Sequence, residues 1–405
     1  MTETAAGARA ASRLPALDWM RGLVMVLMAI DHSSDAFNAG RLFTDAVGFW
    51  HPGWPLPAAQ FLTRWITHIC APTFVFLAGT GLAFTVARQQ KDGLGAGAIA
   101  WAGSGSARLS PSRRGAGALS GSRWSIDRYI VVRGVIIAAF ELWISLLVMA
   151  PGKFIFQVLY GIGSSYVLMA ALRRLPDRVA PIVALLAIAT MELLVGLATP
   201  SGSASPGLVA SLLLTGGRHG RLIIAYPTLP WLAIMLLGWS WGRRLVTQPA
   251  ARASAPRDLT RAGLAALALF AVLRGLNAYG NMHLLRDSAA PLQWLHVSKY
   301  PPSITYDALE LGLMALILAA LFGLAARRPA RPNSLLMVLG QTPMFFYLLH
   351  FPLLVQSARL LGIEGKRGLG AAYLSAAAVI AFLYPICRRY RDYKAAHRTS
   401  WVRFI

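Results

Sequence analysis

The sequence has little cysteine and little charge. Only 2 of its 405 residues are Cys, and they stand far apart in apolar surroundings, so neither a disulfide framework nor a cysteine-based zinc site has support. Charged residues make up 14% of the chain, whereas a soluble domain carries about 25%. This deficit excludes an ordinary water-soluble globular protein.

Sequence motifs of several soluble enzyme classes are also missing. The chain contains no HExxH, no CxxCH and no GxSxG in a usable context. A glycine-rich phosphate loop needs a strand before it and a helix after it, and that context is not found. We therefore expect no metal site and no phosphate loop of these kinds.

The sequence is instead rich in long apolar runs. Hydrophobic residues make up 56% of the chain, and the mean hydropathy is +0.53. A helix crosses a bilayer with about 20 mostly apolar residues, and the chain offers roughly ten such runs. They predict an all-α polytopic membrane protein, a single transmembrane domain over residues 1–405, whose first run stays as an uncleaved helix. The expected spans lie near residues 17–37, 58–87, 127–150, 154–173, 178–198, 224–245, 259–280, 303–325, 333–358 and 369–388.

Basic residues dominate the charge. The chain has 39 Lys and Arg against 16 Asp and Glu, a net charge of +23. In a soluble protein this excess suggests nucleic acid, but here the basic residues gather in every second segment between the expected spans, which puts most of them on one side of the membrane. The positive-inside rule then predicts both termini in the cytoplasm, an even number of spans and no nucleic acid partner. The segment at about 89–125, rich in Gly, Ser, Ala and Arg, is expected to be a flexible cytoplasmic loop near lipid.

Three histidines fall at one expected depth. His32 ends the first span, His68 lies in the outer part of the second, and His350 lies toward the outer end of the ninth. Ionisable side chains inside a membrane are costly and usually functional. We therefore expect the three imidazoles to meet in a water-accessible pocket that opens toward the outer face.

Two carboxylates and an arginine belong to the same layer. His32 and Asp35 are spaced i,i+3 on one helix face, and Asp31 adjoins His32. A carboxylate on one ring nitrogen fixes the tautomer, and the other nitrogen then takes a proton from an amine or hydroxyl. We expect His32 to be a general base assisted by Asp35 or Asp31, with His68 and Arg64 lining the pocket and Arg64 stabilising negative charge on an acyl oxygen.

Four segments carry a resemblance to a known family. They read "RLPALDWMRGLVMVLMAIDH", "RWITHICAPTFVFLAGTG", "KYPPSITYDALELG" and "LGQTPMFFYLLHFPLL". They resemble bacterial membrane proteins with a heparan-α-glucosaminide N-acetyltransferase-like catalytic domain, most strongly over residues 13–86 and 299–354. The resemblance implies a bacterial inner-membrane acyltransferase. It implies acetyl-CoA as co-substrate from the cytoplasm and a sugar or glycan amine or hydroxyl as acceptor at the outer face.

Individual residues carry over unevenly. Arg21 and Gly22 match the opening motif of the family, and His32 matches the His that ends the first span in the similar polysaccharide acyltransferases. The heparan enzyme instead has a His in the first outer loop, three residues before a Trp. His51 and Trp54 of "HPGW" offer this pair, with a longer spacing to "APTFVF". Arg21 and the basic cytoplasmic loops are expected to attract coenzyme A phosphates.

The remaining candidates surround this expected pocket. His350 is expected as a third wall or as an alternative base, and Lys299 and Tyr300 of "KYPPS" as substrate-binding residues. Direct transfer fits better than a covalent route, for which Cys70 is the one nucleophile near His68. The base is left open among His32, His51 and His68 in any such reaction.

Two other function classes stay open. A proton-coupled transporter or flippase also uses intramembrane His and Asp residues, and a haem protein uses axial His pairs across spans. A transporter should show broken helices in paired halves, and a haem protein a Soret band. The acyl chain, the acceptor and the number of protomers in an oligomer are not fixed by the sequence.

Overall fold

The computed structural model describes residues 14–102, 114–199 and 206–397, and the described chain is mostly helical. Its backbone separates into two compact units. Unit 1 comprises Met1–Phe74, Leu146–Gly152 and Ala253–Ile405, and unit 2 comprises Val75–Ser145 and Lys153–Arg252. The chain passes from one unit to the other within helices as well as between them, so the units are not successive domains along the sequence.

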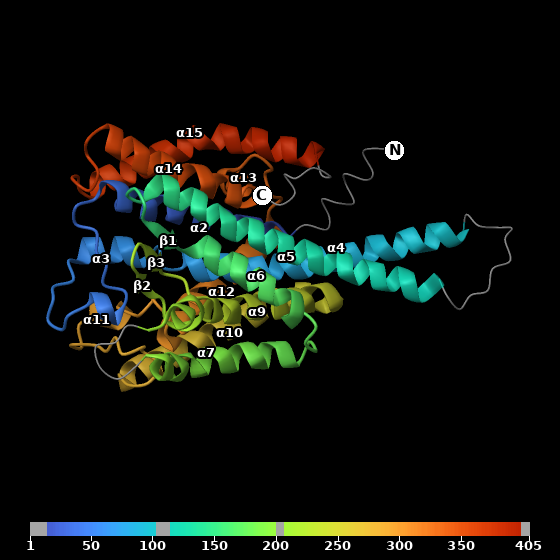
Figure 1. The fold of residues 1–405 in the computed structure, drawn as a ribbon, viewed down its shortest axis with the longest axis horizontal. Coiled ribbons are helices and arrows are strands. Elements are labelled where there is room, and N and C mark those ends of the chain that lie inside the picture. Colours follow the sequence, from blue (N-terminus) through green and yellow to red (C-terminus); the bar gives the residue numbers. More distant parts are fainter. Residues whose placement is uncertain (1–13, 103–113, 200–205, 398–405) are drawn as a thin grey trace. The chain divides into compact units, whose positions relative to one another are not determined.

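Unit 1 is organised around α2 (Pro15–Phe37), against which α12, α13, α14 and α15 pack (Figure 1). The crossing with α13 is close because both helices present glycine. A Cβ atom on Gly340 would lie 1.8 Å from the Asp18 carbonyl oxygen, and one on Gly22 would lie 2.0 Å from that of Leu336. The other helices of unit 1 are α3 (Ala58–Trp65), α11 (Pro291–Leu295), α12 (Ile304–Arg327), α13 (Leu335–Gln341), α14 (Pro343–Leu360), α15 (Leu369–Ala396) and most of α10 (Pro249–Leu276).

Unit 2 holds a small sheet among helices. Strand β1 (Phe154–Phe156) pairs parallel with β3 (Leu222–Ile224), and β2 (Gly217–His219) pairs antiparallel with β3, giving the order β1-β3-β2. The expectation of an all-α chain therefore needs this correction. The helices of unit 2 are α6 (Val158–Leu172), α7 (Val179–Ala198), α8 (Leu208–Ala210), the single π-turn η2 (Ser211–Thr215), α9 (Thr228–Thr247), most of α4 (Cys70–Ala102) and most of α5 (Arg114–Val148).

Within the residues that the structure describes, length and composition give 6 helices able to cross a membrane, or 7 if a bent pair counts as one span. The bent pair is α13 and α14, which meet at 96° across the break before Pro343. The chain is thus a multi-pass membrane protein, with fewer candidate spans than the ten expected. Three expected spans are not among the candidates. Residues 17–37 form α2, with four charged side chains, and 154–173 start with β1, leaving 15 residues for α6. Residues 224–245 fall largely in α9, whose last five residues include two arginines.

The segment expected as a loop at about 89–125 is largely helical. Helix α4 continues to Ala102, and α5 begins at Arg114; residues 103–113 lie outside the described chain. Alanine has the highest helix propensity of any residue, and alanines recur between the glycines and serines of both helix ends. The backbone therefore extends the two helices where composition alone suggested a loop.

Candidate active site

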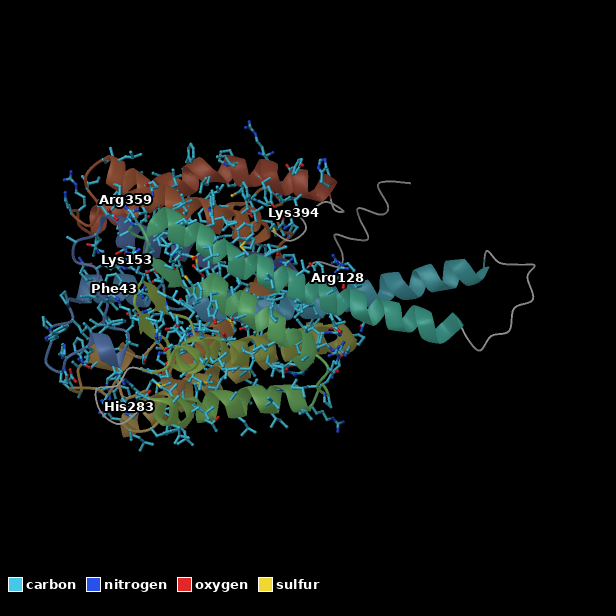
Figure 2. All side chains as sticks on the ribbon, viewed as in Figure 1. Phe43, Arg128, Lys153, His283, Arg359 and Lys394 are labelled. Atoms are coloured by element: carbon cyan, nitrogen blue, oxygen red, sulfur yellow. The ribbon has the colours of Figure 1, made fainter. Side chains whose placement is uncertain are left out.

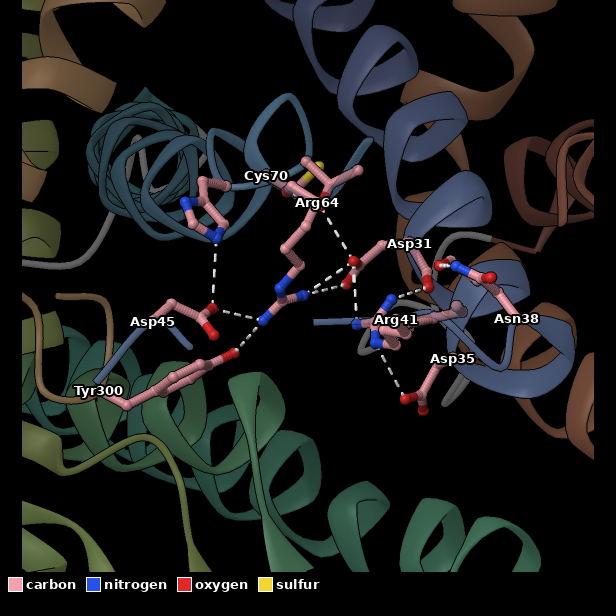
Figure 3. Close-up of polar contacts among 12 residues, drawn as sticks. Asp31, Asp35, Asn38, Arg41, Asp45, Arg64, Cys70 and Tyr300 are labelled. Carbon is pink, nitrogen blue, oxygen red and sulfur yellow. Dashed lines mark hydrogen bonds and ion pairs between the residues drawn. The ribbon is translucent and has the colours of Figure 1, made fainter. Parts of the chain in front are cut away.

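A buried arginine joins the end of α2 to the loop that follows it. Arg64 of α3 donates from Nη1 to both carboxylate oxygens of Asp31, at 2.8 and 3.0 Å. Its Nη2 donates to Asp45 Oδ2 at 2.6 Å and to the Tyr300 hydroxyl at 3.3 Å (Figure 3). Both terminal nitrogens are therefore used by protein groups. The sequence placed Arg64 in one layer with Asp31, and its expected role toward an acyl oxygen remains a prediction.

The two carboxylates at the end of α2 bind arginines. Arg41 donates to the backbone carbonyl of Asp31 at 2.6 Å and to its Oδ1 at 3.0 Å, and its Nε lies 3.2 Å from Asp35 Oδ1 (Figure 3). Thr67 donates a further hydrogen bond to Asp31 at 3.0 Å. Both carboxylates were expected to assist His32, but their described contacts lead to Arg41 and Arg64 instead.

His32 has a histidine as its partner. Its Nδ1 lies 2.9 Å from Nε2 of His350, and Nδ1 of His350 lies 2.8 Å from the Phe346 carbonyl oxygen. The Phe351 ring stacks on His32 with centroids 3.9 Å apart. His350 is fully buried and His32 is 9% exposed. Two of the three histidines expected to meet are thus in direct contact.

His68 is held separately by a carboxylate. Its Nε2 lies 3.2 Å from Asp45 Oδ2, and Nδ1 finds no hydrogen-bond partner within the described chain. Its backbone carbonyl accepts a hydrogen bond from the Tyr306 hydroxyl at 2.9 Å. Its side-chain contacts in the described structure lead to Asp45 and the Tyr306 ring rather than to His32. His68 therefore joins the arginine network and has the carboxylate–imidazole geometry that the sequence assigned to His32.

Asp45 connects this network to the segment before α12. Its backbone carbonyl accepts hydrogen bonds from the amides of Lys299 and Tyr300, at 2.8 and 3.3 Å. Burial by itself raises the pKa of Asp45, but the charge of Arg64 and the hydrogen bond to His68 outweigh it and hold that pKa well below its ordinary value. Asp45 is therefore ionised near neutral pH.

The acid stability of the fold should depend on Asp45. A carboxylate whose folded pKa is depressed stabilises the fold above its unfolded pKa of about 3.9, and this stabilisation is lost as the pH falls through the folded pKa. In detergent, we expect the wild-type thermal midpoint to lose this contribution only below about pH 4. Asp45→Asn should have a lower midpoint near neutral pH and a weaker fall in acid. Asp177→Asn, which removes an exposed partner of Arg243, is the control; an unchanged acid limb in Asp45→Asn would contradict the assignment.

Lys299 is a buried cation beside the network. It is 3% exposed, and its ammonium lies 5.3 Å from the centroid of the Tyr300 ring. Within the part of the chain that the structure describes, this ammonium makes no hydrogen bond or ion pair. Its charge nevertheless acts on both His32 and His68. Its charge also acts on the carboxyl group of Glu310, so Lys299 is a buried cation near acidic side chains with which it makes no direct ion pair in the described structure.

The outer-loop pair is assembled but exposed. The rings of His51 and Trp54 lie edge to face with centroids 4.5 Å apart, and Trp54 is 51% exposed. Asp287 fixes this turn by accepting hydrogen bonds from Trp50 Nε1 and from the Gly53 amide, at 3.2 and 3.1 Å. Phe43 of the same connection is 57% exposed (Figure 2). The structure thus places His51 in solvent-facing surroundings, apart from the buried histidines.

Arg21 and Cys70 complete the expected set. Arg21 donates to Asp18 Oδ1 at 3.1 Å near the opposite end of α2 from His32, and Gln341 donates to the other Asp18 oxygen at 3.2 Å. Cys70 is buried, and its thiol donates to the Val24 carbonyl at 3.4 Å. Neither contact leads to the histidines. The role of Arg21 toward coenzyme A remains a prediction.

Sequence reasoning missed several members of the network. Asp45, Arg41 and Thr67 give no periodic signal. The first two lie in the irregular part of the connection before the short 3-10 helix η1 (Val47–Phe49), and Thr67 lies in the short break between α3 and α4. Among the described residues, no group of three His, Cys, Asp or Glu side chains lies close enough to hold a metal. The sequence signals that pointed to this part of the chain were the density of polar residues after an apolar run and the common expected depth of the three histidines.

Apolar helices long enough to span a bilayer, with ionised and imidazole side chains buried among them, define a multi-pass membrane protein with an internal polar site. The family described as heparan-alpha-glucosaminide N-acetyltransferase, catalytic, matches residues 13–276, and the chain belongs to it. It is thus a member of a membrane acyltransferase family. The matched range includes His32 and His68, whereas Lys299 and His350 follow it. A comparison with curated proteins found no match.

Proposed function

We propose that the chain moves an acyl group, typically acetyl, from cytoplasmic acyl-CoA to an amine or hydroxyl of a sugar or glycan beyond the bacterial inner membrane. The observation that supports this most directly is the orientation of His32. Its Nδ1 is held by His350, which leaves Nε2 as the nitrogen that can take a proton. A positioned imidazole with one available nitrogen is what a general base requires.

The reaction needs one proton transfer and one displacement. Nε2 of His32 takes the proton of the acceptor amine or hydroxyl while the acceptor atom bonds to the carbonyl carbon of the thioester. The carbonyl oxygen becomes negative, and as it re-forms the double bond, the carbon–sulfur bond breaks. The thiolate of coenzyme A leaves and the proton on His32 neutralises it. No covalent acyl-protein step is needed, in agreement with the engaged thiol of Cys70.

Lys299 is the better candidate for stabilising the developing negative charge. Arg64 has both terminal nitrogens bound to Asp31, Asp45 and Tyr300, whereas the Lys299 ammonium has no such partner in the described structure. A positioned cation in a buried site stabilises a forming oxyanion more than a ground-state carbonyl. The role that the sequence analysis gave to Arg64 therefore passes to Lys299 in this proposal.

Replacing Lys299 tests this assignment. Lys299→Met should lower kcat by about 10²–10³-fold, the usual cost of one oxyanion donor, with a smaller change in KM. Lys366→Met removes an exposed lysine that bonds only its own turn at Gly362 and should leave kcat unchanged. Initial rates at saturating acyl-CoA measure both. A kcat of Lys299→Met within twofold of wild type would return the oxyanion role to another group.

The proposed function is tested with purified protein in vesicles. Acetyl-CoA labelled in its acetyl group is supplied on one side and a glucosamine-type acceptor on the other. We expect label on the acceptor, in proportion to protein and absent without it. Failure to bind acyl-CoA in a direct binding measurement would overturn the proposal.

The break between α13 and α14 supports one alternative. Broken helices line substrate sites in secondary transporters, and α14 carries His350. The same vesicles, loaded with a pH-sensitive dye and given acceptor without acyl-CoA, distinguish the two classes. Coupled proton and solute flux without acyl transfer would favour a transporter or flippase.

A further inference from the structure

The contact between His32 and His350 determines where the protons of both rings lie. His350 Nδ1 faces the Phe346 carbonyl oxygen at 2.8 Å. A carbonyl oxygen only accepts, so this nitrogen must carry a hydrogen. The other nitrogen of a neutral His350, Nε2, is then an acceptor. It lies 2.9 Å from Nδ1 of His32, which must in turn carry a hydrogen.

These two hydrogen bonds leave one ring nitrogen of the pair, on His32, with a free lone pair. With a hydrogen on Nδ1, a neutral His32 has a bare Nε2. The reverse tautomer would set two lone pairs against each other at 2.9 Å. His350 has no nitrogen left for a substrate, because Phe346 takes one and His32 takes the other. His350 therefore cannot be the alternative base that the sequence analysis allowed.

Aromatic rings hold the two imidazoles in this register. His32 and His350 stack with centroids 4.9 Å apart, Phe346 stacks on His350 at 4.6 Å, and Phe351 stacks on His32 at 3.9 Å. The Tyr347 ring stands edge-on to both histidines at 5.7 Å. All of these residues except His32 lie on α14. Helix α14 thus supplies both the acceptor nitrogen for His32 and the aromatic rings that pack around the His32 ring.

We propose that His350 is a positioning residue that fixes His32 in the tautomer with hydrogen on Nδ1, so that Nε2 is the basic nitrogen. When Nε2 takes the acceptor's proton, His32 becomes a cation whose Nδ1 hydrogen bonds to His350 more strongly, since charge-assisted hydrogen bonds are stronger than neutral ones. His350 thereby fixes the tautomer of His32, a role that the sequence assigned to Asp35 or Asp31. The catalytic role of His350 rests on the proposed function, whereas the positions of the hydrogens on the two rings do not.

A purely structural role for the pair is the competing explanation, since histidines in spans also bond neighbouring helices. Two variants of His350 distinguish the roles: one keeps the volume of the aromatic ring, and the other keeps the hydrogen-bonding groups. His350→Phe keeps an aromatic ring and removes the acceptor. His350→Gln supplies an amide N–H for the Phe346 carbonyl and an amide oxygen that accepts from His32. A structural role depends on volume, whereas the positioning role depends on the acceptor.

The test uses the full-length protein in lipid nanodiscs, with ¹⁵N-labelled histidine and with kinetics. Nitrogen chemical shifts should show hydrogen on Nδ1 of His32 in the wild type and in His350→Gln, and a mixture of tautomers in His350→Phe. The kcat of His350→Phe should fall about 10²–10⁴-fold, the range set by loss of a correctly oriented base, with KM nearly unchanged. His350→Gln should recover at least a tenth of the wild-type kcat. His219→Phe, at a histidine bonded to Ser211 in unit 2, should match wild type.

Two results would overturn the inference. One is hydrogen on Nε2 of His32 in the wild type. The other is equal activity of His350→Phe and His350→Gln, whether high or low, with both variants folded by circular dichroism. A wild-type protein that transfers no acyl group would instead overturn the proposed function, while the chemical shifts would still decide the tautomer.

Discussion

His32→Asn is expected to fold normally and to lose acyl transfer. The Asn side-chain amide places an N–H near the position of Nδ1, so the hydrogen bond to His350 at 2.9 Å has a replacement donor. No atom of the Asn side chain replaces the lone pair on Nε2 of the imidazole. Loss of a general base costs about 10²–10⁴-fold in kcat. Turnover of labelled acetyl-CoA in nanodiscs measures the loss, and acyl-CoA affinity should stay within a few-fold of wild type.

His51→Asn is the informative companion variant. It removes the exposed imidazole beside Trp54, which the family resemblance offered as an alternative base. If His32 is the base, His51→Asn changes KM for the acceptor more than kcat. If His51→Asn abolishes transfer while His32→Asn leaves it intact, the chemistry belongs to the outer loop.

Arg64→Met should be the most destabilising single change in unit 1. It removes a guanidinium whose side chain is 8% exposed and leaves Asp45, at 4%, without its closest cation. Breaking a buried ion pair by removing one partner costs about 3–5 kcal/mol, because the remaining charge stays buried and uncompensated. Arg64→Lys should recover little, since an ammonium cannot bond two carboxylates and a hydroxyl with the same planar geometry. Chemical unfolding in mild detergent measures the loss.

Controls for Arg64 separate stability from chemistry. Arg243→Met removes the surface pair with Asp177 and should change stability little. Arg64→Met combined with Asp45→Asn should lose less than the two single changes added together, because the double variant leaves no charge without its partner. A folded Arg64→Met protein of normal stability whose kcat alone falls would instead support the oxyanion role predicted from the sequence.

Much of the architecture could be predicted from apolar run length. Residues 58–87, 127–150 and 178–198 were expected as spans and coincide with candidate spans, because uninterrupted apolar sequence has few alternatives to a membrane helix. Residues 17–37 do form a helix, but its charged side chains remove it from the candidates. Short strands such as β1 are hidden inside an apolar run, since three residues carry no measurable periodicity.

The site was predictable in composition but not in pairing. Spacing along the sequence shows which residues share a helix face, and His32 and Asp35 were paired for that reason alone. The actual partner of His32 is His350, which is 318 positions away. Likewise, Asp45 has no neighbour pattern to mark it, yet it binds Arg64, His68 and the backbone of Lys299. Such choices are made by tertiary packing between distant segments.

The glycine crossing of α2 and α13 limits how unit 1 can move. Backbone there meets backbone at distances that admit no side chain, so neither helix can slide or rotate along the other without separating first. Any rearrangement around His32 should therefore move α2 and α13 together, as one rigid body.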